Sequence, residues 1–193
     1  MQWNRKKVFI AVSFFVLLVS VVGGLTLSRS TDDVDVKLTD PGVTATPGIG
    51  TNANASGKPF PRTSVVDINS QEDVELAAKA APMVVNFWFS TCEPCKREMP
   101  ALAAAAKKYG TAVSFVGVNP NDTATAARTF LEKYSVTFPN YLDDGDLMAD
   151  VGIVNMPTTV FVNTNGIIVA THAGEITAEQ INEIITEEFG VQS

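Results

Sequence analysis

Residues 84–100, VVNFWFSTCEPCKREMP, contain an apolar run that is followed closely by two cysteines, and two residues separate these cysteines. The run from Val84 to Phe89 is too apolar for a half-exposed strand and is typical of a strand that is covered on both faces of a sheet. After Cys92, apolar residues recur at helical spacing, and Pro94 stands in a first turn, where a helix tolerates proline. The stretch therefore predicts a buried strand followed by a helix, with the cysteines at the junction.

The two cysteines stand where this helix is expected to begin. Unpaired backbone N–H groups and the positive end of the helix dipole favour an anion there, so the pKa of Cys92 is expected to fall and its thiolate to attack near neutral pH. Cys95, one turn further along, is placed to resolve a mixed disulfide. The chain has no other cysteine. We therefore expect a redox-active pair with Cys92 as the exposed nucleophile and Cys95 as the buried resolving thiol.

The order of strand, Phe-Trp, Cys-x-Pro-Cys-Lys and helix resembles the thioredoxin superfamily. Asn86, Glu93 and Glu98 narrow the resemblance to membrane-anchored, extracytoplasmic thiol-disulfide oxidoreductases of the TlpA and ResA type, some of which serve cytochrome c maturation. The resemblance covers roughly the last two thirds of the chain. It implies an α/β, thioredoxin-like fold with a mixed central sheet flanked by helices, and an extra helix and strand between the two halves of the core. It also implies that the only redox group is the Cys92–Cys95 disulfide, without a cofactor.

A second motif, Met156-Pro157-Thr158, comes directly before a predicted hairpin. In the family that the chain resembles, the proline at this position is cis and faces the cysteine pair. The backbone groups beside such a proline can pair with an extended substrate strand. The resemblance therefore implies catalytic roles for Cys92, Cys95, Pro157 and Glu98, and a binding surface made by Trp88, Glu93, Pro94, Met156 and Thr158.

Two glutamates next to the pair have different expected roles. Glu98 follows Cys95 by three residues on the same helix face, so it could accept the proton of the resolving thiol if it is partly buried. The alternative is a solvated helix residue. The charge of Glu93 is expected to raise the pKa of Cys92, which favours a reducing couple. The chain departs from the family at Thr91, which stands where a Trp usually precedes the first cysteine, so the apolar surface on which substrates dock is expected to differ.

Other functions remain open on the sequence. A thiol peroxidase would need a Thr three residues before its cysteine, where this chain has Phe89. A copper-binding module of the Sco type would have a wider C-x-x-x-C pair and a distal His. A zinc site would need a second pair of ligands, and His172 is the only histidine. We therefore expect no metal site and a reductant of protein disulfides, with a disulfide-forming oxidase as the opposite direction of the same chemistry.

The net charge and the composition indicate which classes of partner the protein can bind. The chain of 193 residues has 46% hydrophobic residues, a formal net charge of −7 and a pI near 4.7. From Ser64 onward there are 17 acidic and 7 basic side chains, a difference of −10. Nucleic-acid binding requires a basic face, so nucleic acid is not an expected partner. The expected partners are extracytoplasmic protein thiols or disulfides.

The N-terminus predicts the compartment. Residues 1–7 are basic, and residues 8–27 form an uncharged stretch that is long enough to cross a bilayer. The basic flank places the N-terminus in the cytoplasm and the rest of the chain outside. We expect a retained single-pass anchor at 8–27, with a cleaved signal peptide as the alternative, a flexible linker at 28–63 and the thioredoxin-like domain at 64–193. A membrane thiol-disulfide electron donor is then an expected partner.

Local patterns predict the remaining elements of the domain. Val65–Ile68 is expected to be a strand, and Ser70 with Asp73 resembles a capping box for a helix through about Ala80. The alternation of strands and helices that follows is typical of a parallel core. Thr177 and Gln180 are expected to cap a last helix with an apolar stripe. The other predicted elements are a motif helix ending at Gly110, a strand at 113–119, a helix at 123–134, an extended segment at 136–142, a short helix at 146–151, and a hairpin of 158–163 and 167–171 around an Asn-Gly turn.

Overall fold

The computed structural model describes residues 52–192. The basic N-terminus at 1–7, the predicted anchor at 8–27 and the linker up to residue 51 lie outside the described residues. None of the helices in residues 52–192 has the length and apolar character needed to cross a membrane. The elements are, in chain order, β1 (Thr63–Asp67), β2 (Asp73–Leu76), β3 (Met83–Phe87), α2 (Glu93–Tyr109), β4 (Ser114–Asn119), α3 (Ala124–Lys133), β5 (Asn140–Leu142), α4 (Asp146–Val151), β6 (Thr158–Val162), β7 (Ile168–Ala173) and α5 (Ala178–Phe189).

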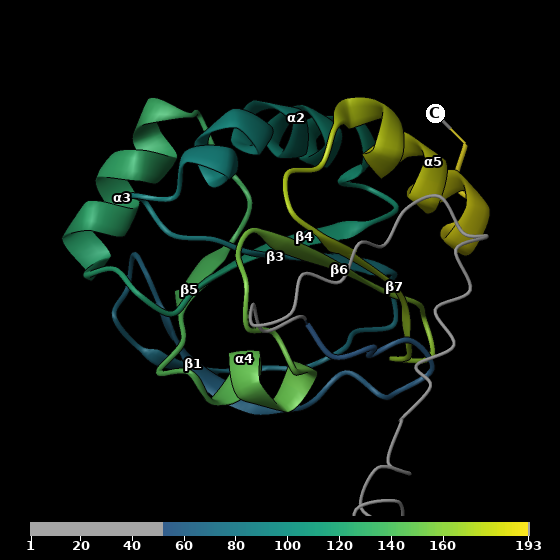
Figure 1. Cartoon of the computed structure of the whole chain (residues 1–193), viewed down its shortest axis with the longest axis horizontal. Helices are drawn as coiled ribbons and strands as arrows, with labels where there is room; N and C mark the ends of the chain where they lie inside the picture. Colours follow the sequence, from purple (N-terminus) through teal and green to yellow (C-terminus); the bar gives the residue numbers. More distant parts are fainter. Residues whose placement is uncertain (1–51, 193) are drawn as a thin grey trace, which may run out of the picture. The chain divides into compact units, whose positions relative to one another are not determined.

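These strands form one mixed sheet in the order β2-β1-β5-β4-β3-β6-β7. The central pairs β3–β4 and β4–β5 are parallel, and the remaining pairs are antiparallel. Helices α2, α3 and α5 cover one face of the sheet, and α4 lies on the other (Figure 1). The expected mixed sheet with flanking helices is thus confirmed. An extra strand and helix, β5 and α4, lie between α3 and β6.

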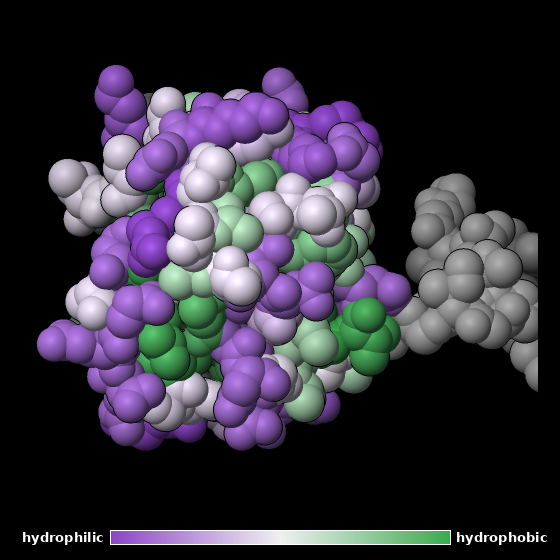
Figure 2. Space-filling view, turned by 90° about the vertical axis from the view of Figure 1, so that its left-hand side faces the viewer, coloured by the Kyte–Doolittle hydropathy of each residue, from purple (hydrophilic) through white to green (hydrophobic). Residues whose placement is uncertain are grey.

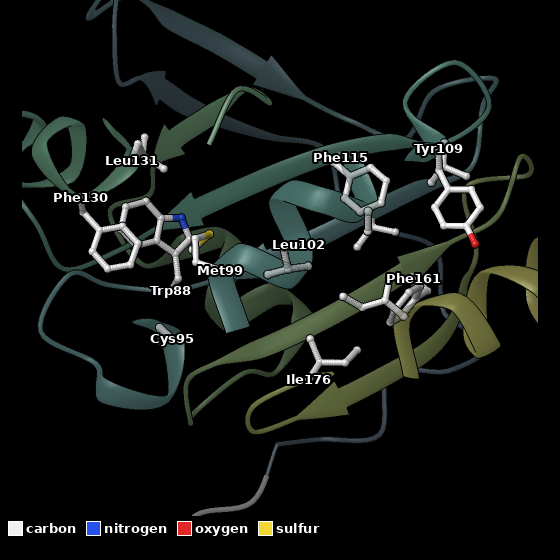
Figure 3. Close-up of a cluster of buried hydrophobic side chains, with 14 of the residues drawn as sticks. Trp88, Cys95, Met99, Leu102, Tyr109, Phe115, Phe130, Leu131, Phe161 and Ile176 are labelled. Atoms are coloured by element: carbon white, nitrogen blue, oxygen red, sulfur yellow. The ribbon is translucent and has the colours of Figure 1, made fainter. Parts of the chain in front are cut away.

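The central strands divide the core into two clusters because successive side chains of a strand point to opposite faces. Val84 belongs to the cluster beneath α2, α3 and α5, whereas Val85 belongs to the cluster on the α4 side. All five residues of β3 are buried, which agrees with a strand covered on both faces. Figure 3 shows the first cluster running from the neighbourhood of Cys95 to the far end of α2, along Phe130, Trp88, Met99, Leu102, Phe115 and Tyr109.

The surface is mostly hydrophilic on the side where α3 lies, and its hydrophobic areas are interrupted by polar side chains (Figure 2). Among the described residues 52–192, Val154 is the only large hydrophobic side chain classed as exposed, at 57%. Val154 lies in the loop between α4 and β6, three residues before the cis proline. This loop therefore presents an apolar side chain to solvent.

Most predicted elements are confirmed, with α4 at 146–151 and the Thr177–Gln180 capping box both present. The helix predicted from Ser70 to Ala80 is wrong. Asp67 accepts hydrogen bonds from the N–H groups of Asn69 and Ser70 with its side chain, and Gln71 has a φ of 61°, so the chain turns back there. Residues 73–76 then form β2, in which exposed and more buried residues alternate. The alternation of apolar and polar residues favours a strand at 73–76, and the side chain of Asp67 stabilises the turn before it. These two effects outweigh the capping-box pattern of Ser70 and Asp73.

The ordered domain also begins earlier than the boundary at 64 that the sequence suggested. Ala55 is 1% exposed and Phe60 7% exposed, and both belong to the cluster on the α4 side. Backbone hydrogen bonds join Gly57 N to Ile168 O and Ile168 N to Lys58 O, each at about the length of a sheet bond. Residues 52–60 thus pack along the domain, although their composition of small and polar residues is typical of a linker.

Candidate active site

Cys92 and Cys95 form a disulfide at the start of α2. Cys92 is the N-cap residue, and its sulfur accepts the backbone N–H of Cys95 at 3.2 Å. Cys92 is 5% exposed and Cys95 is fully buried. Of the two cysteines, the N-cap residue is thus the more accessible, although neither is widely exposed in the oxidised pair. A thiolate of Cys92 would lie at the positive end of the helix dipole, next to N–H groups that have no partner within the helix.

The loop that ends at Pro157 lies at the edge of the sheet from which β3 leads to this disulfide. Thr158, the first residue of β6, is opposite Phe87, the last residue of β3, so the loops beyond these two strand ends meet at the same edge of the sheet. The Met156–Pro157 peptide bond is cis, as the resemblance implied. The Met156 side chain packs against the cluster that contains both cysteines. The carbonyl of Pro157 accepts the N–H of Gly174 at 2.8 Å, whereas no hydrogen bond within residues 52–192 uses the backbone N–H or carbonyl of Met156.

Glu98 is buried beneath the pair rather than solvated. Its side chain belongs to a residue only 1% exposed, and its two oxygens accept hydrogen bonds from Asn86 Nδ2 at 2.8 Å and from the N–H of Ile176 at 3.0 Å. Asn86 Nδ2 also donates to Thr159 Oγ1 at 3.1 Å. Burial raises the pKa of Glu98 to about 7, even though the two hydrogen bonds lower it. A carboxylate with this pKa can hold or release a proton near neutral pH.

The loop between β3 and α2 is held by an aspartate that the sequence analysis did not single out. Asp122 accepts hydrogen bonds from the N–H and the hydroxyl of Ser90, at 2.6 and 2.8 Å, and from Asn119 Nδ2 at 2.7 Å. The side-chain oxygen of Asn119 in turn accepts the N–H groups of Asn121 and Asp122. The Asn-Pro-Asn-Asp sequence after a buried strand was a turn signal that could have indicated this anchor.

The other expected binding residues lie at different depths. Trp88 is fully buried, stacks on Phe130 with ring centroids 4.6 Å apart, and donates its indole N–H to Asn140 Oδ1 at 3.0 Å. It therefore supports the site from within the core and has no surface for a substrate, which corrects its expected binding role. Thr158 is also buried and uses its hydroxyl inside the protein. Pro94 lies in the first turn of α2 and is partly exposed.

Glu93 is an exposed residue that forms an ion pair with Lys96 at 2.5 Å. The hydrogen bond from Lys96 and its positive charge lower the pKa of Glu93. The neighbouring lysine therefore offsets much of the negative charge that was expected to act on Cys92. Within residues 52–192, no three metal-ligating side chains form a group that could hold an ion.

Comparisons with known proteins agree with this geometry. Residues 55–185 match the model of the Redoxin family. The chain is 31% identical over 137 residues to the thiol-disulfide oxidoreductase ResA of Bacillus subtilis, covering 69% of this chain and 76% of that protein. It is 28% identical over 130 residues to the thioredoxin-like protein YneN of the same organism, covering 66% and 76%.

A solved structure gives the same answer for the fold. The crystal structure of StoA from Bacillus subtilis is 29% identical and superposes with a TM-score of 0.56, covering 64% of this chain and 96% of StoA. The thioredoxin-like α/β fold is thereby confirmed for the part of the chain that the structure describes. The chain belongs to the Redoxin family, and it is a thiol-disulfide oxidoreductase of the ResA and StoA type that carries the pair Cys92 and Cys95.

Proposed function

We propose that this oxidoreductase works as a reductant of protein disulfides and that Glu98 is its internal proton acceptor. The observation that carries the proposal is the buried Glu98 carboxylate, three residues beyond Cys95 on α2 and held by Asn86 and Ile176. Residues at this spacing share one face of a helix. A reductant must deprotonate its buried resolving thiol, and a nearby base with a pKa of about 7 suits that task.

The proposed reaction transfers two electrons from the enzyme dithiol to the substrate disulfide. The Cys92 thiolate attacks one sulfur of the substrate disulfide, forms a mixed disulfide and releases the first substrate thiolate. Cys95 then gives its proton to Glu98, and the new thiolate attacks the Cys92 sulfur. This step closes the Cys92–Cys95 disulfide and releases the second substrate thiolate. The substrate thiolates take up protons from water, and an external dithiol must reduce the enzyme again.

The substrate is proposed to bind as an extended segment along Met156. The N–H and carbonyl of this residue make no hydrogen bond within the described part of the chain, while its side chain packs against the cluster that includes the cysteines. An extended chain can pair with such free backbone groups, as in other cases of strand addition. In this proposal Pro157, Glu93 and Pro94 border the same area.

The proposed setting is the extracytoplasmic face of a membrane. It rests on the uncharged stretch at 8–27 with its basic flank and on the family resemblance. In this setting a membrane thiol-disulfide donor would supply electrons, and apocytochrome c cysteines are a proposed substrate class. Membrane fractionation of cells that carry the full chain, compared with a variant lacking residues 8–27, tests the anchor, and a full chain recovered in the soluble fraction would contradict it.

The reduction potential tests the proposed direction. We expect a value closer to the about −270 mV of thioredoxin than to the about −120 mV of a disulfide-forming oxidase. The measurement is equilibration with glutathione or dithiothreitol buffers, followed by quantification of the free thiols. Reduction of insulin disulfides is the matching activity assay, with Cys92→Ser as the inactive control. A potential near the oxidase value, together with faster oxidation of reduced substrates, would reverse the proposed direction.

A further inference from the structure

Residues 52–55 lie across the loop that leads to the cis proline. The N–H of Ala53 donates to the carbonyl of Gly152 at 2.8 Å, and Ala55 is buried in the same cluster as Val151 and Ile153. Gly152 has a φ of 81°, and a Cβ added there would lie 2.7 Å from the Cβ of Ala53. The two segments can therefore approach this closely because residue 152 is a glycine.

Asn52 makes the polar contacts between the two segments. Its side-chain oxygen accepts the N–H groups of Val154 and Asn155, each at 2.9 Å, and its Nδ2 donates to Thr158 Oγ1 at 2.6 Å. The Thr158 hydroxyl donates to the carbonyl of Asn155 at 2.7 Å. All these partners lie on either side of Met156 and Pro157. A single side chain thus ties both flanks of the loop to each other.

We propose that Asn52 is a positioning residue for substrate binding, because it holds the loop from Gly152 to Pro157 in the conformation that presents the Met156 backbone beside Cys92. The inference rests on the proposed function, in which a substrate segment binds along Met156. Val154 is 57% exposed, so the loop lies at the surface. Without the Asn52 side chain, water would compete for the N–H groups of Val154 and Asn155, and the loop would have to be ordered at each binding event.

The test compares Asn52→Ala with Asn54→Ala in the full chain. Asn54 is the matched control because its side chain accepts only the nearby N–H of Ser56 and does not reach the loop. We expect Asn52→Ala to raise KM for insulin disulfide reduction about fivefold, the size of one lost hydrogen bond, with kcat changed by less than about twofold. The rate constant of the reduced enzyme with the small disulfide DTNB should stay at the wild-type value, because that reagent needs no extended binding segment. Asn52→Asp keeps acceptors for both N–H groups, so its KM should lie between those of Asn52→Ala and wild type.

Hydrogen exchange of peptides covering residues 150–160 provides a readout that does not depend on the reaction. We expect faster exchange in Asn52→Ala than in Asn54→Ala and wild type. Unchanged exchange would overturn the positioning role, and so would an equal loss of rate towards insulin and DTNB, which indicates a general structural defect. If wild type itself does not act on insulin or any protein disulfide, the proposed function fails. Faster hydrogen exchange of the loop in Asn52→Ala would still show that Asn52 holds the loop from Gly152 to Pro157.

Discussion

At the scale of single residues, Glu98 and Asn86 form a pair that can serve two protonation states. The side-chain amide of Asn86 donates hydrogen bonds to Glu98 and Thr159, while its Oδ1 has no hydrogen-bond partner among the described residues. If Glu98 takes up a proton, rotation of the Asn86 amide would let Oδ1 accept the new O–H group. The buried network can then hold a charged or a neutral Glu98 without a new unpaired donor at the carboxyl group.

Glu98→Gln is predicted to change how the free energy of unfolding depends on pH. The pKa of Glu98 is raised from 4.5 to about 7 in the folded state, so the folded wild type binds the proton more tightly than the unfolded chain. The wild-type free energy of unfolding should therefore fall as pH rises through this window, by roughly 2 to 3 kcal/mol between pH 5 and 8. Glu98→Gln should lack this fall. Denaturant unfolding at both pH values measures it, and Glu183→Gln, an exposed glutamate on α5, is the control that should follow wild type.

The same variant is predicted to separate proton transfer from stability. Removing the like charge should lower the pKa of the Cys95 thiol, and removing the base should slow thiol-disulfide exchange near neutral pH. A pH titration of thiol reactivity with Cys92 blocked measures the first effect, and insulin reduction measures the second. Curves that superimpose on wild type would mean that the proton leaves through water.

Cys95→Ala is predicted to trap mixed disulfides through Cys92. Cys92 is the N-cap residue and the less buried cysteine, so it should react first, and a substrate bound to it can then be released only by an external thiol. Nonreducing gels after incubation with insulin should show the adduct. Cys92→Ala should show none, and trapping in that variant instead would exchange the two roles.

At the scale of elements, the site is built where β3 and β4 end and where α2 and β6 begin. Asp122, after β4, connects the end of β4 to the loop that follows β3, because its side chain accepts hydrogen bonds from the N–H and the hydroxyl of Ser90.

Asp122→Ala is predicted to lower the free energy of unfolding by about 1 to 3 kcal/mol, because hydrogen bonds to a charged group are lost and the N–H of Ser90 loses its partner. Chemical denaturation measures the loss. Asn121→Ala, an exposed neighbour, should cost less than about 0.5 kcal/mol, and equal losses would remove the special role of Asp122.

Elements whose signals lie within a few neighbouring residues could be predicted from the sequence. The apolar run before Cys-Glu-Pro-Cys indicated a strand-to-helix junction, and the Thr177–Gln180 capping box formed as its pattern indicated. The helix predicted from Ser70 failed because Asp67 caps a turn with its side chain, a competition that only the turn geometry decides. The burial of Glu98 and the role of Asn52 depend on partners 78 and 106 residues away along the chain. No local pattern contains such pairings.

At the scale of the whole domain, the described residues enclose two hydrophobic clusters, one on each face of the sheet, and the segment before β1 completes the second. Phe60 is 7% exposed in the cluster with Met83, Val85 and Val160 from the central strands. Its N–H donates to the carbonyl of Gly166 at 2.8 Å. Residues 52–60 are therefore a structural part of the domain, although the sequence suggested a linker up to residue 63.

Phe60→Ala is predicted to destabilise the domain as a core substitution does, by roughly 3 kcal/mol, because the lost ring would leave a cavity against the sheet. A true linker residue would cost almost nothing. Denaturant unfolding of the full chain measures the change, with Lys58→Ala as the matched control, since Lys58 is exposed and contributes backbone hydrogen bonds that alanine keeps. The two variants should differ in midpoint and agree in the slope against denaturant, because the surface exposed on unfolding is nearly the same. If Phe60→Ala were as stable as Lys58→Ala, residues 52–60 would not be part of the hydrophobic core. Asn52 would then lie on a segment that is not anchored to the domain, and it could not hold the cis-proline loop in one conformation.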